Sequence, residues 1–262
     1  MVVGDHVTVT TDNVNLRAGP SPTAAIVAVF MTGTTAVVTE LGGAWTKVLI
    51  DGPAKIKGYF STQFLSTSGY LSKVHDTHVF PMFPGTPHAN ITANFPFVCD
   101  GLRACNLDDR PMLLMALGTI RAETAGFKPI SEGVSRYNTS PGGAPFDLYD
   151  PPTQIARTPG NTHKGDGAKF KGRGFVQLTG RSNYQRIGQQ VGANLIGDPE
   201  LCNDPKTAGR ILAQFLKNAE PAIRTALKSN NLAQARKLVN GGSHGLDAFE
   251  DAYNKGLSSL PT

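Results

Sequence analysis

The apolar residues change their spacing once along this 262-residue chain, and that change limits the possible folds more than any other feature. Between residues 5 and 66, short β-branched runs alternate with Gly-Pro, Thr-Gly, Gly-Gly and Asp-Gly turn signals. Beyond residue 95 the apolar period lengthens toward 3.6, the value of an α-helix. We therefore expect two domains, one all-β and one mainly α-helical.

The N-terminal segment has runs of strand length at residues 6–10, 24–30, 35–39 and 45–50. Runs this short, bounded by turn residues, are typical of β-strands. About five short strands in a segment of this size are too few for a two-layer sandwich. A small closed barrel is the economical solution, so we expect one here.

Several motifs in this segment resemble those of a bacterial SH3-like domain. They are Asn13-Val-Asn-Leu-Arg-Ala-Gly-Pro-Ser-Pro22, Gly33-Thr34, Gly43-Ala-Trp-Thr-Lys-Val48 and Gly58-Tyr59. The resemblance implies a wall-binding SH3-like module over residues 1–67, because that family binds cell-wall peptide or glycan. Trp45 and Tyr59 are the candidate contact residues, with a place in the barrel core as the alternative for both.

Residues 68–85 are rich in Ser, Gly, Pro and Thr, and we expect them to form a linker to a catalytic domain at 86–262. Asp109 followed by Pro111 is typical of a helix N-terminus, and the apolar run 112–120 predicts a buried helix. A loop-rich stretch is expected between 130 and 174. Further helices are predicted at residues 181–191, 204–218, 232–239 and 246–257.

The net charge of +5 is concentrated in the C-terminal part, because residues 1–70 carry four basic and four acidic side chains. Residues 164–186 hold six basic residues against one acid, Asp166. Such a stretch attracts polyanions, although an ordinary solvated face is an equal alternative. No nucleic-acid-binding signature accompanies it. No apolar stretch approaches the ~20 residues of a membrane span, and no signal peptide is visible at the start.

Three cysteines, Cys99, Cys105 and Cys202, cannot all pair with one another. Cys99 and Cys105 could close a small loop, and the spacings do not match a zinc site. Cys99 also precedes a predicted short helix at 100–104, a position that can lower the pKa of a thiol. A cysteine amidase, with one of the histidines at 75, 78, 88, 163 and 244 as its base, is therefore a distant alternative.

Two glutamates lie nine residues apart around the end of the buried helix. Glu123 follows the apolar run, where partial desolvation favours the neutral form of a carboxyl group. A salt bridge to Arg121 or another arginine is the alternative explanation for its position. Glu132 follows on a returning loop, between a proline and a glycine. Two such groups facing each other about 6.5–9.5 Å apart would suit an inverting glycosidase.

A longer set of motifs resembles glycoside hydrolase family 19, which includes chitinases and lysozyme-like endolysins. The motifs are Ala122-Glu-Thr-Ala-Gly-Phe127, Asn161-Thr-His-Lys-Gly-Asp-Gly167, Phe170-Lys-Gly-Arg-Gly-Phe-Val-Gln-Leu-Thr-Gly-Arg-Ser-Asn-Tyr184 and Val239-Asn-Gly-Gly242. The resemblance spans about residues 86–258 and implies a lysozyme-like α+β catalytic domain. It departs from many members at Ala122, where they have His.

This resemblance implies a role for each matching residue. Glu123 is the expected general acid, Glu132 the general base, and Thr179 the hydroxyl that helps hold the attacking water. The amides expected to bind sugar are those of Gln177, Asn183 and Asn240. Tyr184 and Arg173 belong to the same substrate-binding motif, where bracing is a better interpretation than direct contact. Asp166 is interpreted as a turn residue, and no metal or organic cofactor is expected.

The short spacing of the two glutamates favours peptidoglycan over chitin as the substrate, and an endolysin-like lysozyme over a chitinase. We expect a monomer that acts on the cell wall after secretion or release by lysis. A catalytically inactive adhesion protein that kept the fold to bind glycan is a further alternative. The presence of both glutamates argues against it.

Overall fold

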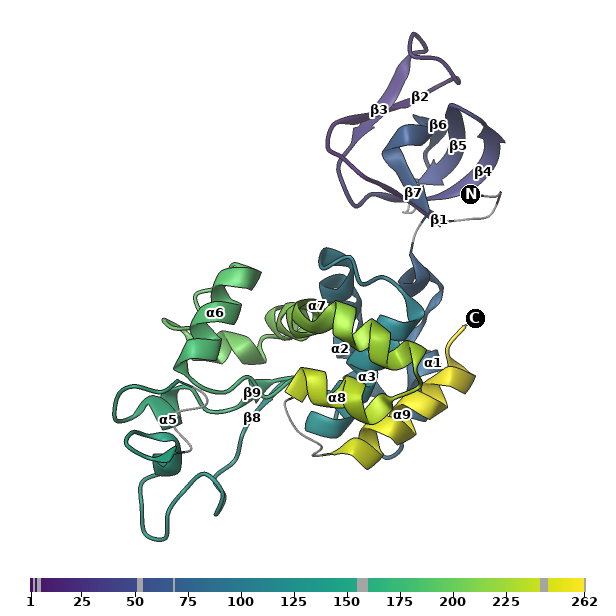
Figure 1. Ribbon diagram of the computed structural model, residues 1–262. Helices are drawn as coiled ribbons and strands as arrows, with labels where there is room; N and C mark the ends of the chain where they lie inside the picture. Colours follow the sequence, from purple (N-terminus) through teal and green to yellow (C-terminus); the bar gives the residue numbers. More distant parts are fainter. Residues whose placement is uncertain are drawn as a thin grey trace. The chain divides into compact units, whose positions relative to one another are not determined.

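The computed structural model describes residues 1, 3, 6–50, 54–67, 69–154, 160–240 and 245–261. The chain divides into two compact units, Met1–Lys73 and Val74–Thr262 (Figure 1). The first is built from β-strands and the second mainly from helices, which confirms the predicted fold class.

The first unit is one antiparallel sheet that curls into a small barrel (Figure 1). The strand order is β3-β2-β6-β5-β4-β1-β7, so among the described strands the ladder ends at β3 and β7. A short 3-10 turn, Thr62–Phe64, precedes the last strand. The strands are β1 His6–Val9, β2 Val14–Arg17, β3 Ile26–Phe30, β4 Thr35–Gly42, β5 Trp45–Ile50, β6 Lys57–Ser61 and β7 Leu65–Thr67.

The barrel core comes from the inward-facing residues of alternating strands. In β5 every second residue is buried, and the pattern is the same in β2. The core includes Val7, Leu16, Val48 and Phe60 but neither Trp45 nor Tyr59, which are half-buried on the other face. The choice between core and surface that the sequence left open for these two aromatic residues is therefore decided in favour of the surface.

The second unit packs its helices around α3, Arg110–Glu123, which contacts α2, α7, α8 and α9. Asp109 is the N-cap of α3 and accepts from the backbone N–H of Met112 at 3.0 Å, as the sequence predicts. All residues from Met112 to Ile120 are buried. The other helices are α1 Asp76–Val79, α2 His88–Ala104, α5 Asp166–Lys169, α6 Arg181–Val191, α7 Pro205–Lys228, α8 Leu232–Asn240 and α9 Leu246–Ser259.

Three stretches of the second unit differ from the sequence prediction. Helix α2 is much longer than the predicted 100–104, because Pro96 did not end it. Helix α7 continues through Pro221 to Lys228. The segment expected as a linker, 68–85, holds short helical turns, and Val79, Met82 and Phe83 within it are buried. Burial of these apolar side chains explains why the unit boundary lies at Lys73.

Within the described residues, no helix combines the length and the apolar character that crossing a membrane requires.

Candidate active site

The segment between Glu123 and Glu132 is fixed by a buried aromatic residue. Phe127 has a positive φ of 52° and is fully buried, with its ring centroid 4.7 Å from that of Phe83 and 6.1 Å from that of Phe175. Phe175 lies inside the long 170–184 motif. This packing therefore attaches the turn after α3 to the 170–184 segment, which carries most of the other predicted site residues.

Glu123 ends helix α3 and is bound by an arginine from α8. Its Oε1 accepts from Nη2 of Arg236 at 2.6 Å, and Arg236 is fully buried while Glu123 is 14% exposed. Gly245 packs against Ala122 on the same helix end. The salt bridge to an arginine, which the sequence offered as the alternative explanation for the position of Glu123, is therefore formed. The arginine partner is Arg236 and not the neighbouring Arg121.

Glu132 lies directly after the short strand β8, Ile130–Ser131, which pairs with β9, Arg173–Gly174. Its carboxylate accepts three hydrogen bonds. Oε1 accepts from Asn138 Nδ2 at 2.9 Å and from the Tyr149 hydroxyl at 2.8 Å, and Oε2 accepts from the backbone N–H of Gly172 at 3.1 Å. All three partners are donors without a formal charge, so they orient the carboxyl group through hydrogen bonds alone.

Tyr149 keeps its proton under all ordinary conditions. Burial, and then the hydrogen bond and charge of Glu132, raise the pKa of Tyr149 above its usual value of about 10. Asn138 is fully buried, and its Oδ1 accepts from the backbone N–H of Ser135 at 2.8 Å. Tyr149 therefore remains a donor to Glu132, and Asn138 is held with its Nδ2 directed at the same carboxylate.

Gln177 occupies a strained turn beside Glu132. Its φ is 50°, which is unusual for a residue other than glycine. Nε2 donates to the carbonyl oxygens of Ile130 at 3.0 Å and Gly174 at 3.1 Å. A Cβ added at Gly172 would meet both Gln177 Oε1 and Glu132 Oε2. The two side chains thus converge on Gly172, and Oε1 is the Gln177 atom left for a ligand.

Thr179 and Asn183 continue the same chain of interactions. The Thr179 hydroxyl donates to the Gln177 carbonyl at 2.8 Å, which leaves its oxygen lone pairs as acceptors. Asn183 donates through Nδ2 to the Thr179 carbonyl at 2.9 Å, and its Oδ1 accepts from Arg186. Both side chains are half-buried. Gln177, Thr179 and Asn183 are therefore linked along one turn and helix start, and Glu132 lies beside Gln177 at Gly172.

Arg173 and Tyr184, which the motif groups with the substrate-binding residues, brace this region from inside, and this agrees with the bracing interpretation and not with substrate contact. Tyr184 is fully buried and Arg173 is 4% exposed. Arg173 donates to Glu200 Oε1 at 2.6 and 2.9 Å and to the Tyr184 hydroxyl at 3.1 Å, and that hydroxyl donates to the carbonyl of Lys171 at 2.6 Å. Neither side chain is accessible to a polysaccharide.

Asp166 joins the loop before α5 to the start of α6. Its carboxylate forms an ion pair with Arg181 at 2.6 Å and accepts from the backbone N–H groups of Thr162 and His163. The Arg181 hydrogen bond is the main reason that the pKa of Asp166 lies well below its usual range, although burial opposes the shift. Gly165 and Gly167 donate their N–H groups to Asp150 at 2.7 Å. This turn is a structural brace, as the sequence indicated.

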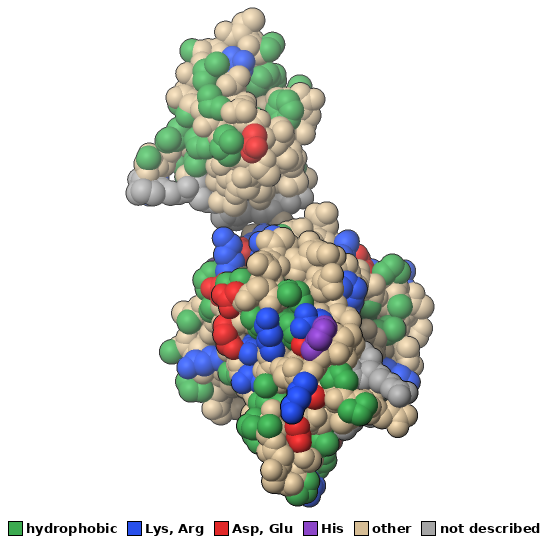
Figure 2. All heavy atoms as spheres, turned by 90° about the vertical axis from the view of Figure 1, so that its left-hand side faces the viewer, with side chains coloured by type: hydrophobic (Ala, Val, Ile, Leu, Met, Phe, Trp, Pro, Cys, Tyr) green, Lys and Arg blue, Asp and Glu red, His purple; other side chains and the backbone are tan. Residues whose placement is uncertain are grey.

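The basic stretch 164–186 is less strongly positive than its composition indicates. Arg173 and Arg181 are paired with Glu200 and Asp166. Figure 2 shows acidic side chains among the basic ones on this side of the second unit. This pairing favours the ordinary solvated face over a polyanion-binding site.

The cysteines do not fit a catalytic role. All three are free thiols, so Cys99 and Cys105 form no disulfide. Cys99 lies inside α2 and not before a helix, and burial raises its pKa to about 12. This overturns the premise of the cysteine amidase alternative, which needed a lowered pKa. Among the described residues, no group of three His, Cys, Asp or Glu side chains could hold a metal ion.

Asn240 ends helix α8, but its side chain lies outside the described residues, as do residues 241–244 with His244. The described neighbours on either side, Arg236 and Gly245, contact Glu123 and Ala122. Sequence reasoning missed Arg236, Asn138 and Tyr149. None of them stands in a distinctive motif, and Arg236 has the appearance of a surface arginine on an amphipathic helix.

Both parts of the chain match known families. Residues 138–217 match glycoside hydrolase family 19, described as chitinase class I, and residues 12–66 match the bacterial SH3 domain. The two resemblances found in the sequence are thereby confirmed over these residues. The hydrolase match contains Thr179, Asn183 and the Asn138 that binds Glu132.

Curated relatives match over short segments. A glycosyl hydrolase family 19 domain-containing protein of Haemophilus influenzae is 28% identical over 97 residues, 34% of this chain and 41% of that protein. An acidic 27 kDa endochitinase of Solanum lycopersicum is 51% identical over 35 residues, 13% of this chain and 14% of that protein. Chitinase 8 of Oryza sativa subsp. japonica is 46% identical over 39 residues, 15% of each chain. The chain thus spans less than half the length of these relatives.

Among solved structures, chitinase C from Streptomyces griseus HUT6037 is similar, with a TM-score of 0.47 and 18% sequence identity. The similarity covers 74% of this chain and 95% of that one.

Proposed function

We propose that this chain, which carries a glycoside hydrolase family 19 segment and a bacterial SH3 domain, hydrolyses β-1,4 glycosidic bonds in peptidoglycan. The observation that carries the proposal is the pair of differently supported carboxylates. Glu132 is held by three neutral donors, and Glu123 is held by one buried arginine. Glycosidases need two such groups in different roles.

Glu132 is the proposed general base. Its donors Asn138, Tyr149 and Gly172 fix the carboxylate without adding charge, so it is ready to accept a proton from water. Thr179 is the proposed second ligand of that water, because its hydroxyl hydrogen is engaged by the Gln177 carbonyl and its lone pairs are not. The water then attacks the anomeric carbon, and the product is inverted.

Glu123 is the proposed general acid. Arg236 binds Oε1, and among the described residues no hydrogen bond engages Oε2, which is the oxygen that would carry the proton to the glycosidic oxygen. Arg236 then stabilises the carboxylate that forms when the proton leaves. In this role Arg236 is a positioning residue, since it acts through Glu123.

The proposed sugar-binding groups are Gln177 Oε1 and the amides of Asn183 and Asn240. An oxygen acceptor such as Gln177 Oε1 suits the N–H of an N-acetyl group or a sugar hydroxyl. The SH3 domain would hold the enzyme on the wall, with Trp45 and Tyr59 on the outer face of its barrel available for contacts.

Chitin is the second candidate substrate, because two of the matching relatives are named as chitinases or endochitinases. The short spacing between Glu123 and Glu132 favours peptidoglycan. Digestion of purified peptidoglycan and of chitin oligomers side by side separates the two, with new reducing ends as the readout. New amino termini without reducing ends would contradict a glycosidase altogether.

The stereochemical course is a second test. Proton NMR of chitin-oligomer or muropeptide digestion, recorded in the first minutes, should show the α-anomer forming first from a β-linked substrate. Initial release of the β-anomer would contradict the proposed single displacement, while hydrolysis itself would still be supported.

A further inference from the structure

We propose that a hollow on the SH3 domain binds the free carboxylate of a short peptide, with Arg17 as the anion ligand and Trp45 as the apolar wall. The inference deepens the proposed wall binding by naming the chemical group that is recognised. It does not depend on which bond the second unit cleaves.

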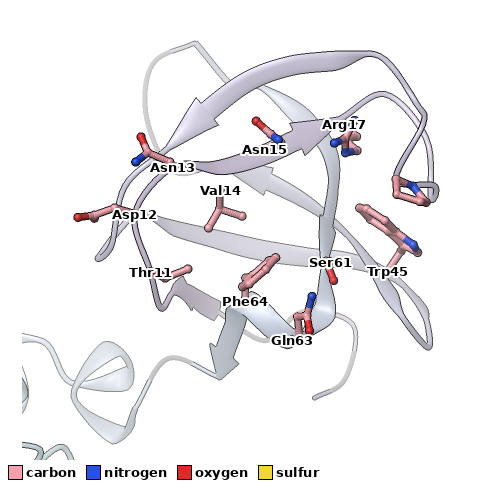
Figure 3. A pocket seen from close by; sticks show the side chains of 11 residues that line it. Thr11, Asp12, Asn13, Val14, Asn15, Arg17, Trp45, Ser61, Gln63 and Phe64 are labelled. Atoms are coloured by element: carbon pink, nitrogen blue, oxygen red, sulfur yellow. The ribbon is translucent and has the colours of Figure 1, made fainter.

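The hollow has a volume of about 440 Å³ and lies along β2. Figure 3 shows Trp45 and Arg17 at one end, with Asp12 and Asn13 at the other. Phe64 and Val14 lie between these ends in the same view. The lining residues are Thr11, Asp12, Asn13, Val14, Asn15, Arg17, Pro22, Trp45, Ser61, Gln63 and Phe64.

Arg17 is held in place at its end of the hollow. Its Nη1 donates to the carbonyl of Ala24 at 2.7 Å, and its backbone pairs with Tyr59 of β6. This pairing requires glycine at the neighbouring position, because a Cβ at Gly58 would lie 2.8 Å from the Arg17 carbonyl oxygen and 2.6 Å from Leu16 Cγ. Arg17 is half-buried, and the hydrogen bond to Ala24 partly orients its guanidinium before any ligand arrives.

The charge of Arg17 has no counterion in the described part of the chain, where its one side-chain hydrogen bond goes to a neutral carbonyl. Asp12 is the other charged lining residue, and it lies at the opposite end of the hollow from Arg17 (Figure 3). Asp12 also accepts from the Thr32 backbone N–H at 2.9 Å. The positive charge at Arg17 is thus not cancelled locally, which favours an anionic ligand.

The rest of the lining indicates what carries that anion. Asn15, Gln63 and Ser61 offer neutral donors and acceptors, which suit the amide groups of a peptide backbone. Trp45 offers a flat apolar surface for a small side chain. A guanidinium binds a carboxylate through two parallel hydrogen bonds, so a peptide ending in a free carboxylate matches all three features.

Trp45 is the only tryptophan of the chain, so its fluorescence reports on this hollow alone. The full chain carrying Glu123→Gln is titrated with N-acetyl-trialanine as the free acid and as the carboxamide. We expect a saturable change in fluorescence with the acid, and binding of the amide weaker by on the order of tenfold or more. Equal binding of acid and amide, or no binding of either, would overturn the proposal.

Substitutions at two basic residues supply the matched comparison. Arg17→Gln should lose on the order of tenfold or more in affinity for the acid and little for the amide, and Arg17→Lys should lose less. Lys57→Gln, on the exposed part of β6 and outside the hollow, should leave binding unchanged. Circular dichroism shows whether Arg17→Gln folds. If it does not, the proposal is tested by comparing the binding of the peptide acid and the peptide amide to the SH3 domain that retains Arg17.

Inorganic phosphate, added as a competitor, tests whether Arg17 accepts any anion. Millimolar phosphate that displaces the peptide completely would overturn recognition of a peptide carboxylate in favour of a phosphate site. Binding is measured in a chain that lacks the proposed general acid. Absence of peptide binding would therefore not contradict the proposed hydrolase activity. Absence of hydrolysis would likewise not contradict peptide binding by the SH3 domain.

Discussion

The two glutamates of the second unit are supported in opposite ways. Among the described residues, Glu123 receives one charged partner, Arg236, from a helix 113 residues further along the chain. Glu132 receives three neutral donors, two of them, Asn138 and Tyr149, from the loop that follows it. A single charged contact is sensitive to loss of either partner, whereas a set of neutral donors loses only a fraction when one is removed. The comparison therefore predicts different responses to mutation.

The largest expected effect is on activity. Glu123→Gln should lower kcat by about 10²- to 10⁴-fold, because an amide cannot donate the proton that the leaving oxygen needs. The measurement is the release of reducing ends from peptidoglycan. Glu40→Gln, at an exposed acidic residue of the first unit, is the control and should retain full activity. Substantial activity in the Glu123 variant would remove the proposed acid.

The next effect is on stability. Arg236→Met should lower the free energy of unfolding by about 3–5 kcal/mol, because it leaves a largely buried carboxylate without its charge partner. Urea denaturation followed by circular dichroism measures the change. The double variant Glu123→Gln with Arg236→Met should recover part of the loss, since no unpaired charge remains. Simple additivity of the two substitutions would show that the ion pair does not couple them.

The ion pair of Asp166 with Arg181 tests whether loss of one charged partner lowers stability at other sites of the second unit as well. Asp166→Asn should cost about 1.5–3 kcal/mol of stability at pH 7, because Arg181 loses a charged acceptor. The pKa of Asp166 is lowered in the folded protein, so its stabilisation is complete above the unfolded value of about 3.9 and is lost as the pH falls below it. The difference between variant and parent should therefore shrink below pH 4. A difference that is constant from pH 7 to pH 2 would contradict this assignment.

Removal of one neutral donor to Glu132 should change stability and activity less than removal of a charged partner. Tyr149→Phe removes one of three hydrogen bonds to Glu132 and should cost about 1 kcal/mol of stability, with a loss of roughly 3- to 10-fold in kcat. Tyr137→Phe is the matched control, because that tyrosine is 69% exposed and its hydroxyl accepts only from the adjacent Arg136. If both variants behave alike, the Tyr149 hydroxyl does not support the base.

The smallest expected effect is that of thiol alkylation. Burial raises the pKa values of Cys99 and Cys202 to about 12, so neither forms an appreciable thiolate at pH 7.5. Iodoacetamide should add at most one adduct per native chain, at the half-buried Cys105, and activity should be unchanged. Mass spectrometry counts the adducts. Loss of activity in step with alkylation would revive a cysteine mechanism.

Local patterns in the sequence determined the elements and the families. The change in apolar period predicted a β unit followed by a helical one, and the N-cap at Asp109 with its apolar run predicted α3. Both family matches rest on contiguous motifs, which is why they were visible without coordinates. Helix α2 was largely missed, because Pro96 in its interior contradicts local propensity and burial of its apolar face outweighs that cost.

The tertiary structure alone decided the partners of the charged and polar groups. Arg236, Tyr149 and Gly172 lie 113, 17 and 40 residues from the glutamates that they bind, and no local pattern encodes such pairings. The same holds for Arg173, whose partner Glu200 lies 27 residues away. Local order depends on backbone propensity and apolar spacing, but electrostatic partnership depends on which surfaces meet when the chain packs.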